Sequence, residues 1–168
     1  MMKILYKAIG SALTLALLWC QTSISALAAT PAVPVLTIKV KQGGNESVQT
    51  LDMKALEAMP QHSFVTHTPW YPKPIKFTGP LLRTVLATNK LTGQVLKATA
   101  INDYTIDIPI EDARTYDVIV ARLMDDKPMS PRDRGPLFVI YPFDSHPKTL
   151  ATQFRERSIW QLKELRVE

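Results

Sequence analysis

The chain has 168 residues, which is enough for one ordinary domain and too few for two of substantial size. Hydrophobic residues make up 46% and charged residues 21%, so the chain can bury a core and global disorder is excluded. A single cysteine, Cys20, excludes a disulfide framework and a cysteine-rich zinc site, and a net charge of +5 spread along the chain does not indicate a nucleic-acid partner.

The N-terminus predicts a secretory signal peptide over residues 1–28. Lys3 and Lys7 precede an apolar run over residues 8–20, and residues 26–28, Ala-Leu-Ala, fit a small-residue cleavage site. An uncleaved anchor is the alternative, but this apolar run is shorter than the roughly 20 residues that a spanning helix needs. We therefore expect cleavage, and no membrane span after it.

The predicted signal peptide contains no Arg-Arg pair, which favours export of the unfolded chain through the general pathway over the twin-arginine route. Cleavage after residue 28 removes Cys20, Lys3 and Lys7, so it lowers the net charge from +5 to +3. We expect residues 29–168 to form one periplasmic domain without cysteine.

The first half of that domain mixes strands, short helices and a proline-rich segment. Alternating apolar residues predict strands, whereas Leu51, Leu56 and Met59 share one helical face before Pro60 ends the helix. In chain order we expect a strand over 35–41, a helix over 51–59, a strand over 62–68, an extended and rigid loop over 69–80, and a helix that begins at Gly79-Pro80 with proline in its first position and ends near Thr88.

The second half is richer in strands. The predicted elements are strands over 94–100 and 104–110, a short helix or turn over 111–116, a strand over 118–124, a turn over 125–128, a strand over 137–141, a helix over 149–157 and a strand over 159–167. Because helices and strands mix without regular βαβ alternation, the fold class is α+β, a compact mixed sheet with short helices.

No pattern of catalytic or metal-ligating residues stands out. The three histidines, His62, His67 and His146, have no metal-binding spacing, and the first two leave opposite faces of a strand. Residues 144–146, Asp-Ser-His, hold the residue types of a serine hydrolase but lack the surrounding nucleophile elbow, so we interpret them as a turn. We therefore expect no metal site and no catalytic residue.

The sequence also contains two pairs of adjacent carboxylates that could act as general acids or bases, Asp125 with Asp126 and Glu111 with Asp112. Both fall at predicted turns, where solvated charge is usual. We expect them to be solvent-exposed rather than to act as general acids or bases.

Residues 66–72 hold Trp70 and Tyr71 among prolines, which fits a stacking wall in a binding cleft. The alternative is that Trp70 only covers the core.

A second candidate is the loop in which Arg132 and Arg134 flank an aspartate beside Gly135, because the two guanidinium groups could receive an anionic group. The alternative, which we favour for this loop, is a solvated hairpin rim.

Three further segments carry a resemblance to a known family. Residues 77–82 (Phe-Thr-Gly-Pro-Leu-Leu), 102–104 (Asn-Asp-Tyr) and 118–142 are similar in order and spacing to the molybdopterin-binding domain of the sulfite oxidase family of oxidoreductases. Residues 158–167, which begin Ser-Ile-Trp, resemble the closing strand of that domain. The resemblance implies the same compact α+β fold over most of residues 48–168.

The resemblance also implies a site that this chain lacks in part. In the family, a cysteine thiolate before the aromatic-x-Gly segment binds molybdenum, and here that neighbourhood is Thr66-His67-Thr68. The family's arginine after Gly-Pro-Leu, which helps to hold the charged cofactor, is Phe138 in this chain. Imidazole is a neutral and harder donor than thiolate, so His67 does not replace the cysteine.

We therefore expect an exported domain with a degenerate cofactor site that binds an unknown small ligand, or a periplasmic or membrane protein, as a sensory or accessory module. Its candidate ligand cleft consists of His67, Trp70, Tyr71, Arg132 and Arg134, and we expect no cofactor. The alternatives are a molybdopterin-dependent oxidoreductase that holds its molybdenum cofactor without cysteine, and an interaction protein without a ligand pocket.

Overall fold

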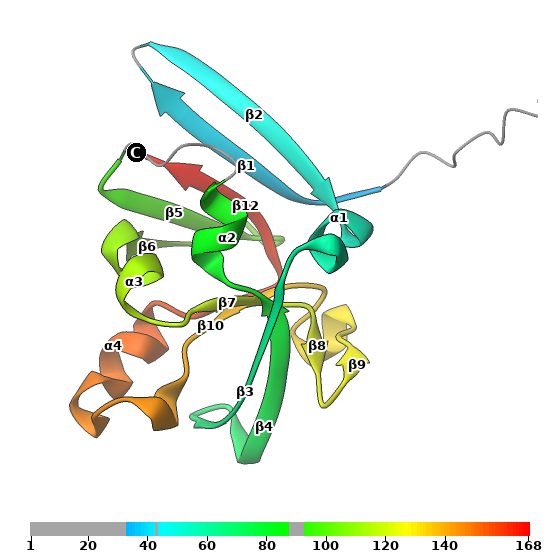
Figure 1. Ribbon diagram of the computed structural model, residues 1–168, viewed down its shortest axis with the longest axis vertical. Helices are drawn as coiled ribbons and strands as arrows, with labels where there is room; N and C mark the ends of the chain where they lie inside the picture. Colours follow the sequence, from blue (N-terminus) through cyan, green and yellow to red (C-terminus); the bar gives the residue numbers. More distant parts are fainter. Residues whose placement is uncertain (1–32, 43, 88–92) are drawn as a thin grey trace, which may run out of the picture. The chain divides into compact units, whose positions relative to one another are not determined.

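The structure is a computed structural model that describes residues 33–42, 44–87 and 93–168. The predicted signal peptide and Cys20 lie outside these residues. Within them the fold is α+β, with three β-sheets and four short α-helices (Figure 1). The expected fold class is confirmed.

The largest sheet has five strands in the order β2-β1-β12-β5-β6. Strands β1 and β12 are parallel, and the other neighbouring pairs are antiparallel. The predicted first strand, the two strands between residues 94 and 110 and most of the closing strand belong to this sheet. The strands are β1 (Pro34–Gln42), β2 (Asn45–Asp52), β5 (Val95–Ala100), β6 (Thr105–Pro109) and β12 (Leu162–Val167).

Strand β2 is the element of this sheet that the sequence pattern does not predict. It forms one edge of the sheet, and most of its side chains are exposed, Val48 to 56%. An edge strand with one buried residue, Leu51, lacks the alternation that marks a half-buried strand. Its pairing with β1 follows instead from the tight connection at Gly44, whose φ of 88° is readily available only to glycine.

The four helices are short, and each lies close to its predicted place. Helix α1 begins after Asp52, whose carboxylate accepts a hydrogen bond from the Ala55 N–H at 2.7 Å, and it ends before Pro60 as predicted. The prediction for the second helix is wrong at its start, because Pro80 ends a strand and is not the first helical residue; Thr88, its predicted end, lies outside the described residues. The helices are α1 (Met53–Ala58), α2 (Leu82–Ala87), α3 (Ile110–Thr115) and α4 (Ala151–Glu156).

Two smaller sheets complete the fold, one in the order β3-β4-β8-β9 and one in the order β11-β10-β7. In Figure 1 the long β3–β4 hairpin lies on the opposite side of the fold from the β1–β2 hairpin. The strands are β3 (Gln61–Thr68), β4 (Tyr71–Pro80), β7 (Ile119–Ala121), β8 (Leu123–Met124), β9 (Lys127–Pro128), β10 (Phe138–Ile140) and β11 (Ile159–Trp160).

The predicted loop over residues 69–80 is mostly strand β4, so that prediction is wrong. Strand β4 pairs with β3 along its length, but β8 pairs with it only at Phe77 and Thr78. Pro72 and Pro74 therefore lie where β4 has a neighbour on one side, and a missing N–H is tolerated there. Proline content alone does not distinguish such a strand from a loop.

Two predicted strands are each divided in two. Arg122 interrupts residues 118–124, so that β7 and β8 belong to different sheets. The Arg122 side chain binds the Glu57 carboxylate at 3.0 Å. Gln161, with a φ of 53°, interrupts residues 159–167 and separates β11 from β12. These breaks allow one chain segment to serve two sheets.

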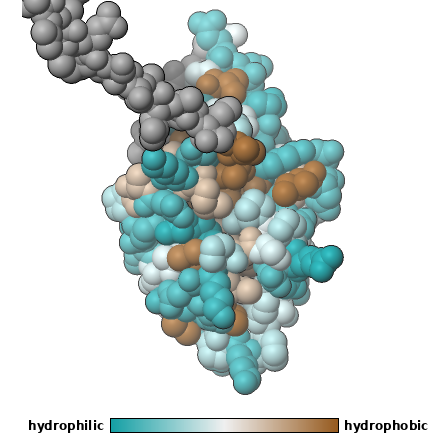
Figure 2. All heavy atoms as spheres, turned by 90° about the vertical axis from the view of Figure 1, so that its right-hand side faces the viewer, coloured by the Kyte–Doolittle hydropathy of each residue, from teal (hydrophilic) through white to brown (hydrophobic). Residues whose placement is uncertain are grey.

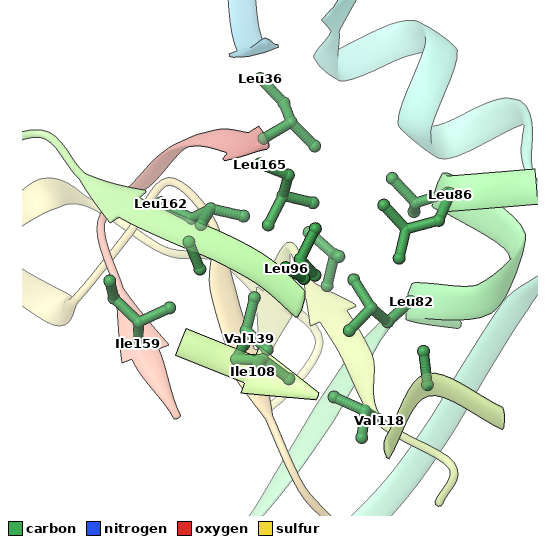
Figure 3. Close-up of a cluster of buried hydrophobic side chains, with 14 of the residues drawn as sticks. Leu36, Leu82, Leu86, Leu96, Ile108, Val118, Val139, Ile159, Leu162 and Leu165 are labelled. Atoms are coloured by element: carbon green, nitrogen blue, oxygen red, sulfur yellow. The ribbon is translucent and has the colours of Figure 1, made fainter. Parts of the chain in front are cut away.

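The core consists of two groups of buried side chains. In the larger group, leucine, isoleucine and valine side chains from the five-stranded sheet, α2, β10 and neighbouring segments converge (Figure 3). The smaller group lies under the β3–β4 hairpin, and the half-buried rings of Trp70 and Tyr71 pack against it. Its buried members are Phe77, Ile119, Ala121, Met129, Phe138 and Ile140.

Hydrophilic residues dominate the described surface visible in Figure 2, where hydrophobic residues form separate patches. None of the described helices has the length and apolar character needed to cross a membrane. Two exposed aromatic side chains, Tyr104 and Trp160, line a common pocket.

Candidate functional site

The β3–β4 hairpin positions three of the five predicted cleft residues. Thr68 pairs with Tyr71, so Pro69 and Trp70 form the turn between the strands, and His67 lies at an irregularity in the register just before it. This turn brings aromatic side chains to the smaller core group and to Trp160, the last residue of β11.

The indole of Trp70 makes edge-to-face contacts with three other aromatic rings. Its centroid lies 5.5 Å from Phe138, 6.0 Å from Phe143 and 5.7 Å from Trp160. Such pairs each contribute roughly 0.5–1.5 kcal/mol beyond area burial. The sequence left open whether Trp70 walls a cleft or covers the core. In the structure its side chain packs on buried Phe138 and also lines the pocket.

Arg134 connects the hairpin to strand β11. Its guanidinium carbon lies 4.7 Å from the ring centroid of Tyr71 and 5.3 Å from that of Trp160, which are cation–π distances. Gln161 donates a backbone hydrogen bond to the Arg134 carbonyl at 3.1 Å. In the described part of the chain the Arg134 side chain makes no hydrogen bond or ion pair, and the buried Tyr71 hydroxyl likewise has no hydrogen-bond partner.

A close approach of the backbone explains the glycine beside Arg134. A Cβ on Gly135 would lie 2.0 Å from the Met129 carbonyl oxygen, so a side chain does not fit there. The Gly135 N–H donates to the Ser130 carbonyl at 2.7 Å, and the Ser130 hydroxyl bonds to Asp133 at 2.8 Å. This loop is therefore internally ordered, whereas Arg132 within it is exposed and makes no described side-chain contact.

His67 points to a different neighbour. Its backbone N–H and its Nδ1 lie 2.8 Å and 2.9 Å from Oδ2 of Asp144. Burial acts to raise the pKa of the Asp144 carboxyl, but the hydrogen bonds from His67 and from Thr66 outweigh it and hold that pKa below its usual value. This pair ties β3 to the 3-10 turn over Phe143–Ser145, and it agrees with the interpretation of residues 144–146 as a turn.

Trp70 also lines a pocket with a volume of about 390 Å³. The turn after β5, the end of α4 and strand β11 supply the rest of its lining: Ala100, Asn102, Tyr104, Arg155, Glu156, Ser158, Ile159 and Trp160. Of the five predicted cleft residues only Trp70 lines it. Arg134 adjoins it through Trp160, and Tyr71 lies behind Arg134, while His67 and Arg132 are not part of it.

Sequence reasoning missed most of the pocket residues. Asn102, Tyr104 and Trp160 fall in segments that carry the family resemblance, but the sequence did not indicate that they bind a ligand. Arg155 and Glu156 are charged residues near the end of a short helix, a pattern typical of any solvated helix. The convergence of three segments that are distant in sequence has no local signature.

Among the predicted solvated carboxylates, Asp112 is an exception. It is 5% exposed, on α3, and its carboxylate accepts hydrogen bonds from Arg157 at 2.8 and 3.0 Å and from the Tyr141 hydroxyl at 2.7 Å. The prediction of a solvated Asp112 is therefore wrong, because Arg157, the residue that follows α4, supplies a partner for its charge. Burial raises the pKa of Tyr141 well above its usual range, and the Asp112 carboxylate adds to that shift.

The other three carboxylates do lie at the surface. Asp125 and Asp126 form the turn between β8 and β9, where Lys76 contacts both, and Glu111 pairs with Arg114. Exposed pairs of this kind contribute little to stability.

The three histidines do not converge. His62 packs near Phe64, His67 binds Asp144, and the ring of His146 lies 5.0 Å from that of Tyr116. Within the described residues no group of three histidine, cysteine, aspartate or glutamate side chains is placed to hold a metal ion.

A mixed α+β domain with a small aromatic pocket is the class of protein that these features define. The sequence model of the oxidoreductase molybdopterin binding domain matches residues 29–144. Since the match covers more than half of the chain, the chain belongs to that family, which confirms the resemblance seen in residues 77–82, 102–104 and 118–142. No curated protein matches the chain.

Proposed function

We propose that the chain is an exported binding module in which the molybdopterin-binding fold is retained and the cofactor site is not. It binds a small ligand or a partner protein as a sensory or accessory component outside the cytoplasm. The observation that carries this proposal is the burial of Phe138 among aromatic rings.

Phe138 stands where the resemblance places the arginine that helps to hold the anionic cofactor. Its side chain is 0% exposed, and the rings of Trp70 and Phe77 lie 5.5 and 5.8 Å away. A charged cofactor at this position would meet apolar rings where it requires a cation, and such a desolvated charge is costly. The aromatic packing fills the place of the anion contact.

The available metal donors point the same way. The chain's single cysteine, Cys20, falls in the predicted signal peptide, and His67 is held by Asp144 near the position that the resemblance assigns to the thiolate. An imidazole with one nitrogen committed to a carboxylate is a poor substitute for a soft thiolate ligand. The residues present therefore do not fit the molybdenum cofactor, and we derive no reaction from it.

The competing function is a molybdopterin-dependent oxidoreductase, and membership of the family favours it. Purification from a host that makes the molybdenum cofactor separates the two functions. We expect neither stoichiometric molybdenum by mass spectrometry nor pterin fluorescence, while a cysteine-containing family member produced in the same host carries both. Stoichiometric molybdenum and pterin in this protein would overturn the proposal.

Export is tested separately. Intact-mass analysis of the protein from a periplasmic extract should give a chain that begins at residue 29. Recovery of the full-length chain from the membrane fraction alone would support the uncleaved anchor instead.

A further inference from the structure

The pocket beside Trp70 contains charged groups that the fold leaves without partners. Arg155 and Glu156 are consecutive residues at the end of α4, both exposed and both lining the pocket. In the described part of the chain neither side chain makes a hydrogen bond or an ion pair. The pocket therefore offers one full positive and one full negative charge.

Asn102 supplies a further donor. Its Oδ1 accepts a hydrogen bond from the Tyr104 N–H at 3.3 Å, so its amide NH₂ group remains available. The Ser158 hydroxyl, in contrast, donates to the Phe154 carbonyl at 2.7 Å. Arg155 and Asn102 can thus donate to an anionic group, and Glu156 can accept from a cationic one.

The walls of the pocket suit a flat apolar group. Trp70, Trp160 and Tyr104 are aromatic, and Ile159 adds an aliphatic surface. Tyr104 is 60% exposed, so its side chain is open to a ligand. The volume of about 390 Å³ lies within the usual range for small-molecule sites, roughly 300–1,000 Å³.

We propose that the pocket binds a free aromatic amino acid. Its ring lies against the three aromatic walls, its carboxylate binds Arg155 and Asn102, and its ammonium group binds Glu156. A neutral sugar would use neither charge, and an aromatic acid without an amine would bring its carboxylate close to Glu156 with no compensation. This inference rests on the proposed function, because it names the ligand class of that module.

Calorimetric titration with three related compounds tests the inference. L-Phenylalanine has both charged groups, 3-phenylpropionate lacks the amine, and phenethylamine lacks the carboxylate. We expect phenylalanine to bind at least about tenfold more tightly than either analogue, since each charge-assisted contact is lost in one of them. Equal affinities for the three compounds would overturn the inference.

Two variants assign each charge to its residue. Arg155→Gln should weaken phenylalanine and phenylpropionate about tenfold and leave phenethylamine unchanged, whereas Glu156→Gln should weaken phenylalanine and phenethylamine about tenfold and leave phenylpropionate unchanged. Lys148→Gln, which removes an exposed charge just before α4 and outside the pocket, is the matched control and should bind all three compounds as the unaltered protein does.

The aromatic walls are tested through their most exposed member. Tyr104→Ala should weaken phenylalanine about tenfold without changing the urea midpoint, and L-leucine should bind the unaltered protein more weakly than phenylalanine by a similar factor. Absence of phenylalanine binding would overturn the inference, but the proposed function would fail only if molybdenum and pterin were found in the purified protein.

Discussion

Helix α4 and the residue that follows it place two arginines, two positions apart, in opposite situations. Arg157 binds the buried Asp112 carboxylate, which the Tyr141 hydroxyl also contacts. Arg155 lines the pocket and has no described partner. The same residue type, two positions apart in one segment, is thus committed to the fold in one place and left available in the other.

The difference distinguishes charged side chains that stabilise the fold from charged side chains that are available to a ligand. In the first cluster each charged group has a hydrogen-bonded partner, so its removal is expected to alter folding. Around the pocket the charges are unpartnered, so their removal is expected to alter binding alone. This division between paired and unpartnered charges predicts that the loss of Arg157 has the largest effect on stability.

Arg157→Ala should lower the free energy of unfolding by about 3 kcal/mol, because it leaves the Asp112 carboxylate buried with a single hydroxyl partner. Urea denaturation measures the change. Arg155→Ala is the matched control, and its effect should stay below about 0.5 kcal/mol. Equal losses in the two variants would mean that Arg155 is as important to the fold as Arg157.

Trp70→Ala should lower the free energy of unfolding by about 2 kcal/mol and also weaken ligand binding, because Trp70 packs on Phe138 and lines the pocket. The same denaturation experiment, run beside calorimetry, measures both effects. An unchanged urea midpoint would show that Trp70 serves the pocket without covering the core.

Tyr141→Phe removes one hydrogen bond from Asp112 while the Arg157 contacts remain, so it should cost about 1.5 kcal/mol. Its urea midpoint should therefore lie between those of the unaltered protein and Arg157→Ala. A loss as large as that of Arg157→Ala would mean that the hydroxyl compensates the buried charge as much as the guanidinium does.

The smallest effect concerns the exposed pair of His67 and Asp144. Because the folded-state pKa of Asp144 lies below its ordinary value of 3.8, the pair contributes stability above that pH and loses it as the pH falls through the lower folded value. Carbon-13 NMR of the carboxyl should show a midpoint below 3.8. A midpoint at or above 3.8 would mean that burial outweighs the hydrogen bonds from His67.

The sequence predicts much of the fold because its strands and helices carry local patterns. Alternation marks β1 and β6, β-branched and aromatic residues mark β3, and Asp52 and Pro60 mark the ends of the first helix. Strand β4 escapes prediction because its prolines lie where the sheet has an edge, and β2 because its side chains are mostly exposed. Both depend on neighbours, which a local pattern does not contain.

The candidate cleft is less predictable than the fold. Trp70 is identified from its aromatic and proline-rich surroundings, but Arg155 and Asn102 reach the pocket from segments more than fifty residues apart. Asp112 shows the same difficulty, because its partner Arg157 lies forty-five residues along the chain. Whether a charge is buried, paired or free is a property of the tertiary structure.

An NMR titration of the isotopically labelled protein with L-phenylalanine tests the division between the two arginines most directly. We expect that the indole signals of Trp70 and Trp160, the side-chain amide of Asn102 and the Nε–H of Arg155 shift together on one binding curve, while the Nε–H of Arg157 stays in place. Shifts centred on Arg157, or no shift at any of these groups, would contradict it.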